Sequence, residues 1–340
     1  MILCWNGRSF LEQFLPSVLQ TTYPNAEIIV ADNASTDGSA AFVAESFPSV
    51  KVIKLPENKG FATGYNQALA QVEADYYVLL NQDVEVEQEW LEPLVEAAER
   101  DATIAACQPK IRWQANKKMF EYAGAAGGFI DQYGYTFCRG RIFQVLEEDV
   151  GQYDSASEIF WESGAAMFIR AELYHKLGGL DDDFFAHMEE IDLCWRLKNA
   201  GYKIMYVPDS IVYHVGGGSL PQGNPRKTYL NFRNNLFLLY KNLPQHRFRL
   251  TMRLLLDQVA ALQFLTKSDM PTARAVWKAN LDYLRHLKQL SRKRKTAWEV
   301  VKTANIGAPN KTGCYRGNLL VEFFVRGKKK WSQLDQDRFL

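Results

Sequence analysis

The chain has 340 residues, enough for two domains or for one domain with a sizeable appendage, and its 47% hydrophobic and 23% charged content is ordinary for a globular protein. Its five cysteines include no Cys-x-x-Cys pair, which excludes a zinc knuckle and a disulfide framework and favours a reducing cytoplasm. No apolar stretch approaches the ~20 residues of a membrane span, and the apolar residues after Met1 are too few for a signal peptide, so we expect neither.

The formal net charge of +1 hides an asymmetry along the chain. From Asn224 onward 24 Lys and Arg face 7 Asp and Glu, whereas the preceding residues carry 16 against 32. An acidic part joined to a basic part suggests separate roles. We therefore predict one domain over residues 1–223 and a second region over residues 224–340.

The first part alternates short apolar runs with segments of helical spacing. The apolar runs predict strands at residues 1–5, 26–31, 50–55, 76–80 and 104–107, and the helical segments lie at residues 10–19, 41–47, 65–72 and 91–98. This order predicts βαβ units, and hence an α/β fold with a mostly parallel, Rossmann-like sheet flanked by helices. Neither GxxxxGK[ST] nor GxGxxG occurs, which argues against a P-loop enzyme or a dehydrogenase.

Two polar clusters follow separate predicted strands, Asp32-Asn33 and Asn81-Gln82-Asp83. Parallel strands bring their carboxyl ends to one edge, where α/β sheets bind nucleotides. The carboxylate of Asp83 would be a hard oxygen ligand for a phosphate-bound Mg²⁺ or Mn²⁺. The alternative is a plain turn after a strand, since Asn and Asp are common in turns.

A second acidic stretch, residues 181–196, leads into a predicted helix that Gly201 ends. Glu189, Glu190 and Asp192 fall in the first turn of this helix. The helix dipole stabilises carboxylates there by roughly 0.3–1 kcal/mol each, which is a purely structural interpretation. The functional interpretation is that one of them is a general base.

His214 ends the apolar runs of residues 202–213 and precedes the glycine-rich segment 215–219. A lone histidine is more often structural than a ligand. A histidine at a strand end before a glycine loop is nevertheless well placed for a metal or a phosphate, and both interpretations stay open. Another predicted strand lies within residues 161–170, where Gly164 permits a close approach of the backbone.

Seven segments, in chain order, resemble family 2 glycosyltransferases, and among these the rhamnosyltransferase-like enzymes of bacterial polysaccharide assembly. They are WNG at Trp5, VADNASTDGS at Val30, ENKGFATGYNQAL at Glu57, LLNQDVEV at Leu79, SGAAMFIR at Ser163, GGLDDDFFAHMEEIDLCWR at Gly178 and YVPDSIVYHVGGGS at Tyr206. Together they extend from Met1 to about Arg233.

The resemblance implies a GT-A fold that moves a sugar such as rhamnose, with inversion, from a nucleotide-sugar donor to a hydroxyl of a glycan or lipid-linked glycan. By position, Asp32 matches the residue that binds the base or ribose. Asp83 matches the metal ligand of the D-x-D motif, and His214 the histidine that meets the metal or the diphosphate. Glu190 matches the catalytic base. The cofactor implied is Mg²⁺ or Mn²⁺.

We assign further residues to the same site. Those expected at the nucleotide are Asn58, Gly60, Asn66 and Asn81, and those expected at the donor or acceptor sugar are Trp161, Gly164 and Glu189. The sequence departs from the family at two points. Asn81 replaces the first Asp of D-x-D, which lowers the charge of a metal site, and Glu190 stands where Asp is usual, which leaves Glu189 as a second candidate base. The short first strand leaves open whether the start of the chain is complete.

The second part is helical and basic. Apolar positions at helical spacing recur over residues 232–243, 248–262 and 271–287, a basic run at residues 292–295 ends the last of these helices, and a further apolar and basic segment covers residues 319–331. Apolar faces flanked by Lys, Arg and Trp suit an anionic membrane surface. The alternative is a helical subdomain with solvated charges. We expect a cytoplasmic protein, peripheral to the inner face of the cell membrane, and no nucleic-acid partner, because no recognised binding motif accompanies the charge.

Other functions fit less well. A sugar-nucleotide pyrophosphorylase would need a glycine- and lysine-rich phosphate loop near the N-terminus. A processive synthase would need membrane spans and a QxxRW motif. Asn81 leaves open a catalytically inactive glycan-binding subunit.

Overall fold

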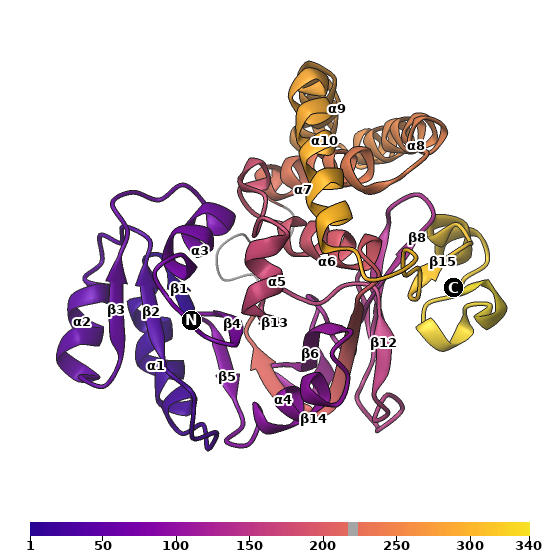
Figure 1. Cartoon of the computed structure of the whole chain (residues 1–340). Helices are drawn as coiled ribbons and strands as arrows, with labels where there is room; N and C mark the ends of the chain where they lie inside the picture. Colours follow the sequence, from indigo (N-terminus) through magenta and orange to yellow (C-terminus); the bar gives the residue numbers. More distant parts are fainter. Residues whose placement is uncertain (217–223) are drawn as a thin grey trace.

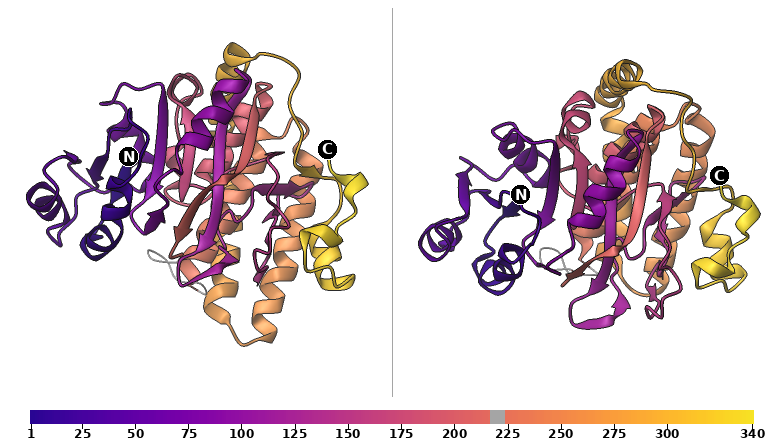
Figure 2. Two further views of the ribbon diagram at one scale, coloured as in Figure 1. Left: turned by 90° about the horizontal axis from the view of Figure 1, so that it is seen from below. Right: turned by 60° about the horizontal axis from the view of Figure 1, so that its bottom comes forward.

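A central sheet with helices on both faces forms the body of the protein in this computed structural model, which describes residues 1–216 and 224–340 (Figure 1). Part of the glycine-rich segment singled out above, residues 217–219, lies outside the described residues. The helices after residue 224 form a group on one side of the sheet. The C-terminal tail lies at the end of the molecule opposite the first strands (Figure 2).

The central sheet has the order β12-β14-β6-β13-β4-β1-β2-β3, with β5 beside β14 and β7 beside β6. Its strands are β1 Ile2–Cys4, β2 Ile29–Asp32, β3 Lys51–Lys54, β4 Tyr76–Asn81, β5 Val84–Val86, β6 Ile104–Trp113, β7 Asn116–Phe120, β12 Ser157–Ile159, β13 Ala166–Arg170 and β14 Lys203–His214. The first four strands run parallel, as the apolar runs predicted, while β13 is antiparallel between β4 and β6. The α/β prediction is thus confirmed.

The apolar runs on either side of Pro208 form a single strand, β14. Its pairing with β6 shifts register between Val207 and Ile211. Proline cannot donate to a strand ladder, so a bulge accommodates it without ending the strand. The strand therefore continues to His214 at the edge where β4 also ends.

A second sheet, of order β11-β10-β9-β8-β15, joins the middle of the chain to its end. Its strands are β8 Gly128–Asp131, β9 Thr136–Cys138, β10 Arg141–Ile142, β11 Val145–Leu146 and β15 Cys314–Tyr315. The Asp131 carboxylate accepts a hydrogen bond from the backbone N–H of Leu319, 2.9 Å away. The C-terminal tail is thus part of the packed structure, and we keep the division at residues 223/224 as a proposal only.

The helices are α1 Arg8–Leu19, α2 Ser39–Ser46, α3 Phe61–Leu69, α4 Glu92–Arg100, α5 Ala171–Lys176, α6 Glu189–Asn199, α7 Pro225–Asn242, α8 Arg247–Thr266, α9 Met270–Arg285 and α10 Leu287–Ala304. The expected single helix from Pro271 to the basic run at 292–295 is in fact two. The chain turns at His286, and α10 packs back against α7 and α6. The basic run therefore lies inside α10.

Asp192 of α6 connects the sheet domain to the C-terminal helices. Its side chain is fully buried and accepts hydrogen bonds from Arg196 at 2.9 Å, Lys241 at 3.0 Å and Asn242 at 2.8 Å. Lys241 and Asn242 belong to the last turn of α7. The three acidic residues of the first turn of α6 thus differ, and Asp192 has a structural role.

We expect Asp192→Ala to lower the free energy of unfolding by roughly 3–5 kcal/mol, because it leaves the buried cations of Arg196 and Lys241 short of a counter-charge. Urea denaturation would measure the loss. The control is Glu299→Ala, whose partner Lys295 is 4.0 Å away on the surface, and which should cost less than about 0.5 kcal/mol. Equal stabilities of the two variants would contradict this account.

Candidate active site

The carboxyl ends of β1, β2 and β4 meet at one edge of the sheet. Cys4 pairs with Asp32 on one side, and Leu3 pairs with Asn81 on the other. The two polar clusters of the sequence are therefore neighbours, as predicted. Asp32 is buried there, with its carboxylate accepting from the backbone N–H of Ser35 at 3.2 Å.

Asn58 and Gly60 form a small polar network beside Asp32. The side-chain oxygen of Asn58 accepts from the N–H of Gly60 at 2.9 Å and from the amide of Asn33 at 3.1 Å. Gly60 has φ of +97°, and a Cβ on it would lie 2.7 Å from the ring of Phe185, so only glycine fits. The side-chain oxygen of Asn33 is buried without a hydrogen-bond partner among the described residues. A polar ligand would supply that partner.

Asp83, in the turn between β4 and β5, faces His214 at the end of β14. His214 pairs with Val84 at the end of β14, and its Nε2 lies 3.3 Å from the Asp83 carboxylate. The amide of Asn81 lies 3.5 Å from the same nitrogen. All three side chains thus converge on one point of the sheet edge.

Glu121 faces the other nitrogen of the His214 ring and was missed by the sequence analysis. Its carboxylate lies 3.4 Å from Nδ1. Burial alone would lower the pKa of His214, but the charges of Glu121 and Asp83 outweigh it and raise the pKa to about 10. Glu121 follows β7 in a segment without any motif, so no sequence signal marks it.

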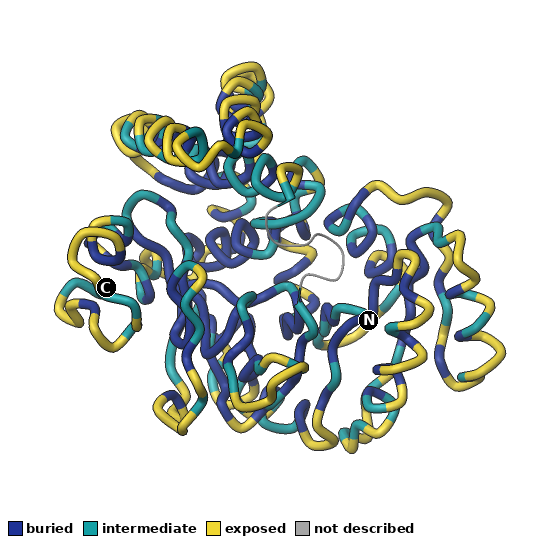
Figure 3. Tube along the Cα trace, turned by 180° about the vertical axis from the view of Figure 1, so that it is seen from behind, coloured by how far each residue is buried: buried dark blue, intermediate teal, exposed yellow. Residues whose placement is uncertain are grey.

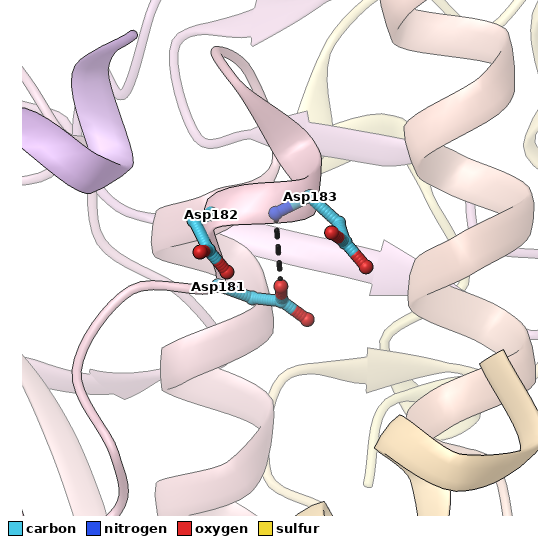
Figure 4. A group of neighbouring side chains, drawn as sticks. All are labelled: Asp181, Asp182 and Asp183. Carbon is cyan, nitrogen blue, oxygen red and sulfur yellow. Dashed lines mark hydrogen bonds between the residues drawn. The ribbon is translucent and has the colours of Figure 1, made fainter. Parts of the chain in front are cut away.

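The run Asp181-Asp182-Asp183 forms a second group of carboxylates, with ligand oxygens within 4.8 Å of one another (Figure 4). Lys293 contacts the carboxylates of Asp182 at 3.2 Å and Asp183 at 2.8 Å, and both Lys293 and Lys241 pair with Asp181. Burial would raise the pKa of Asp181, but these lysines outweigh it and hold the pKa below its usual value. Lysines already neutralise this cluster, which ties the loop before α6 to α7 and α10.

Glu190, the second residue of α6, lies near the sheet edge where Asn81 ends β4. A Cβ on Gly164 would lie 3.8 Å from Cβ of Glu190, and the next residue, Ala165, accepts a hydrogen bond from Asn81 N–H at 2.9 Å. One carboxyl oxygen of Glu190 is buried without a partner among the described residues. Burial raises the pKa of Glu190 to about 7. Residues 164–165 therefore lie between the start of α6 and the end of β4.

Two further carboxyl groups lie with Glu190. Glu189 is buried, and burial followed by the charge of Glu190 raises its pKa well above the ordinary value. Glu162 is fully buried, neither of its oxygens has a hydrogen-bond partner in the described part of the chain, and burial likewise raises its pKa strongly. From the sequence, Glu162 was expected only to lie in or beside a strand within residues 161–170, and not to be a site residue. Both groups are thereby favoured in the neutral form.

The loop before α6 has an uncommon backbone that α7 holds in place. Phe185, His187 and Met188 have positive φ angles, a backbone conformation that residues other than glycine rarely adopt. The side-chain amide of Asn234 lies within hydrogen-bond distance of the carbonyls of Phe184 at 3.0 Å, Ala186 at 2.9 Å and His187 at 2.7 Å. Because this loop ends at the first residue of α6, α7 helps to fix where Glu190 points.

Asn66 and Trp161 have packing roles in the structure. The Asn66 amide exchanges hydrogen bonds with the backbone of Leu180 at 2.7 and 3.0 Å and accepts from Tyr174 at 2.6 Å. Trp161 is buried, and its indole N–H donates to the Phe129 carbonyl at 2.8 Å. Their polar groups are engaged within the protein, so we leave both out of the proposed ligand contacts.

Comparison with known proteins agrees with this fold. The GalNAc-T7 structure with UDP, GalNAc and Mn²⁺ superposes with a TM-score of 0.57 at 19% identity, over 72% of this chain and 48% of that one. The Pyrobaculum calidifontis mannosyltransferase PcManGT, in complex with GDP-Man and Mn²⁺, gives 0.52 at 17% identity, over 89% and 84%.

The sequence also matches the model of the family described as Glycosyl transferase family 2, over residues 1–159. An N-acetylglucosaminyl-diphospho-decaprenol L-rhamnosyltransferase of Mycobacterium tuberculosis is 27% identical over 60% of this chain and 71% of its own. A poly-beta-1,6-N-acetyl-D-glucosamine synthase of Staphylococcus aureus is 26% identical over 61% of this chain, which spans less than half (47%) of that relative.

Fold and sequence together define the protein as a glycosyltransferase with a GT-A fold. Its residues 1–159 match family 2 of these enzymes, and its sequence is similar to that of a rhamnosyltransferase. The resemblance expected from the seven sequence segments is thus confirmed, as is the class of enzyme. The roles of individual site residues stay predictions.

Removing the charge of Glu121 should lower the pKa of His214 from about 10 toward its ordinary value of about 6.5, because one of the two facing carboxylates is lost. A histidine NMR titration of metal-free Glu121→Gln protein would measure the pKa. The control is Glu148→Gln, which alters an exposed carboxylate on a residue that pairs with Met119, two positions before Glu121. An unchanged His214 titration in Glu121→Gln would refute the coupling.

Proposed function

We propose that the enzyme transfers a sugar, with rhamnose the first candidate, from a nucleotide-sugar to a hydroxyl of a lipid-linked glycan in bacterial cell-surface polysaccharide synthesis. The main support is geometric. A Cβ on Gly164 would lie 3.8 Å from Cβ of Glu190, and the carbonyl of the next residue accepts a hydrogen bond from Asn81, whose side chain lies beside His214 and Asp83. The rhamnosyl and lipid-linked parts of the proposal follow the name of the M. tuberculosis relative.

Asp83 and His214 are the proposed ligands of a divalent cation, with the side chain of Asn81 as a third. A carboxylate oxygen and an imidazole nitrogen 3.3 Å apart form a donor set that suits Mn²⁺ or Mg²⁺. Glu121, beside the other ring nitrogen, is placed to fix the ring, as carboxylates do for metal-binding histidines. When bound, the cation would neutralise charge on the diphosphate leaving group.

We assign the nucleotide to the same sheet edge, at the end of β2, on the other side of β1 from β4. Asp32 would accept hydrogen bonds from the base or ribose. Gly60, held by Asn58, lets the backbone approach the ligand, and the unpartnered oxygen of Asn33 offers one more acceptor. Asn33 is an addition to the residues that the sequence indicated.

Glu190 is the proposed general base. It would take the proton of the acceptor hydroxyl as the oxygen attacks the anomeric carbon opposite the diphosphate, which inverts that carbon. A base with a pKa of about 7 is matched to neutral pH. Glu189 and Glu162, favoured as neutral acids, would leave Glu190 as the carboxylate of this group. No specific feature of the site favours a pyrophosphorylase or an inactive subunit.

Glu190→Gln should lower turnover by ~10²–10⁴-fold because the base is lost, while donor affinity stays nearly constant. In the unmodified enzyme kcat/KM should rise with pH through about 7, since the carboxyl must lose its proton to act. Steady-state kinetics with candidate donors would measure both. Glu189→Gln is the matched control and should keep the pH dependence. If Glu189→Gln removes it and Glu190→Gln does not, the base is Glu189.

Asp83→Asn and His214→Gln should each weaken Mn²⁺ binding by at least the roughly 10–100-fold that loss of a second-shell partner costs, because each removes a direct ligand. Affinity should also fall as pH is lowered, because protons compete for the His214 ring. Electron paramagnetic resonance of free Mn²⁺ would report binding. Asp182→Asn, in the lysine-paired cluster, is the control and should change nothing. Loss of binding in Asp182→Asn alone would move the metal site to that cluster.

A further inference from the structure

α8 has one buried face, which contains the ion pair of Arg253 and Asp257, and an opposite face that is apolar but exposed. One face is buried against the rest of the protein and includes Leu250 and Ala261. The other carries Phe248, Leu255, Val259 and Leu262, whose exposed fractions are 69%, 55%, 63% and 58%. At 100° per residue these four positions point about opposite to the buried ones. A helix that only packs on its own domain would need polar residues there.

α9 repeats the same spacing. Met270, Trp277, Leu281 and Leu284 are exposed by 43%, 39%, 46% and 51%. α8 and α9 pack side by side, and the Trp277 indole N–H donates to Gln258 of α8 at 3.1 Å. The exposed row of α9 therefore lies next to α8. We call the eight side chains the apolar face. α8 and α9 project from the body of the molecule, and much of their trace is exposed (Figure 3).

The charge around the apolar face has one sign. Between residues 247 and 288 the exposed charged side chains are all basic: Arg247, Arg249, Lys267, Arg274, Lys278, Arg285 and Lys288. The acids of this range, Asp257, Asp269 and Asp282, are buried or half-buried, and each is engaged by a neighbouring group. Exposed apolar side chains ringed by cations match an anionic bilayer surface, where each Lys or Arg adds about 1 kcal/mol of attraction.

We propose that the apolar face of α8 and α9 binds the surface of an anionic membrane. No helix among the described residues is long and apolar enough to cross one, so the contact would be peripheral. Its purpose rests on the proposed function, since a lipid-linked acceptor is held at such a surface.

α7 connects this face to the active site. One side of α7 packs on α8 and α9, and Asn234 of the same helix holds the loop that precedes Glu190. The membrane face is therefore one helix layer from the proposed base. A bilayer docked on α8 and α9 would sit at a fixed distance from the site.

Sedimentation with phosphatidylcholine vesicles, with and without phosphatidylglycerol, tests the proposal on the full chain. We expect binding only to the anionic vesicles. The variant Leu255→Ser, Val259→Ser, Leu262→Ser should bind about tenfold less or weaker still, because it removes buried apolar contact with lipid. Arg249→Gln, Lys267→Gln, Arg274→Gln should lose roughly fivefold for each charge removed.

The control is Val150→Ser, Ile306→Ser, Val325→Ser, which replaces residues as exposed (74%, 49% and 77%) outside this face and should bind like the unmodified protein. The proposal would be overturned if the unmodified protein did not bind, or if the α8 variant and this control bound equally well. So would a lipid-free dimer that only the α8 variant dissociates, which would make the face an interface between copies. Vesicle binding without sugar turnover would count against the proposed function instead.

Discussion

The buried charge of Asp192 is the interaction on which the arrangement of the molecule depends. A carboxylate fully out of water requires partners, and it finds them in Arg196 of its own helix and in Lys241 and Asn242 of α7. The first turn of α6 is thereby tied to the last turn of α7. Any shift between these helices would leave one of the charges buried without a partner.

This connection matters because Glu190 lies two residues before Asp192. The loop that leads into α6 has positive φ at successive residues, a conformation that costs of order 1–3 kcal/mol per residue and persists only when its surroundings enforce it. Asn234 enforces it from α7 by contacts to three backbone carbonyls. The helices after residue 224 thus support the loop before the proposed base and also form part of the outer surface.

Acidic groups have different electrostatic surroundings at three places in this protein. Lysines neutralise the Asp181–Asp183 run, which makes it a structural joint. The hydrogen bond from His214 and its positive charge hold the pKa of the Asp83 carboxyl below its usual value, although burial alone would raise it. At Glu190 burial outweighs the backbone hydrogen bonds that favour the charged form, and its pKa rises to about 7. The proposed base and metal site differ chiefly in their neighbours.

The sequence determined the parallel strands, the common edge of Asp32, Asn81 and Asp83, and the family, because apolar periodicity and local motifs record what each short segment buries. It did not determine the partners of buried polar groups. Glu121 beside His214, Glu162 beside Glu190, and the packing roles of Asn66 and Trp161 depend on contacts between residues far apart in the chain. The helical spacing of the apolar residues in α8 could be recognised in the sequence. Only the tertiary structure showed that this row of side chains faces outward.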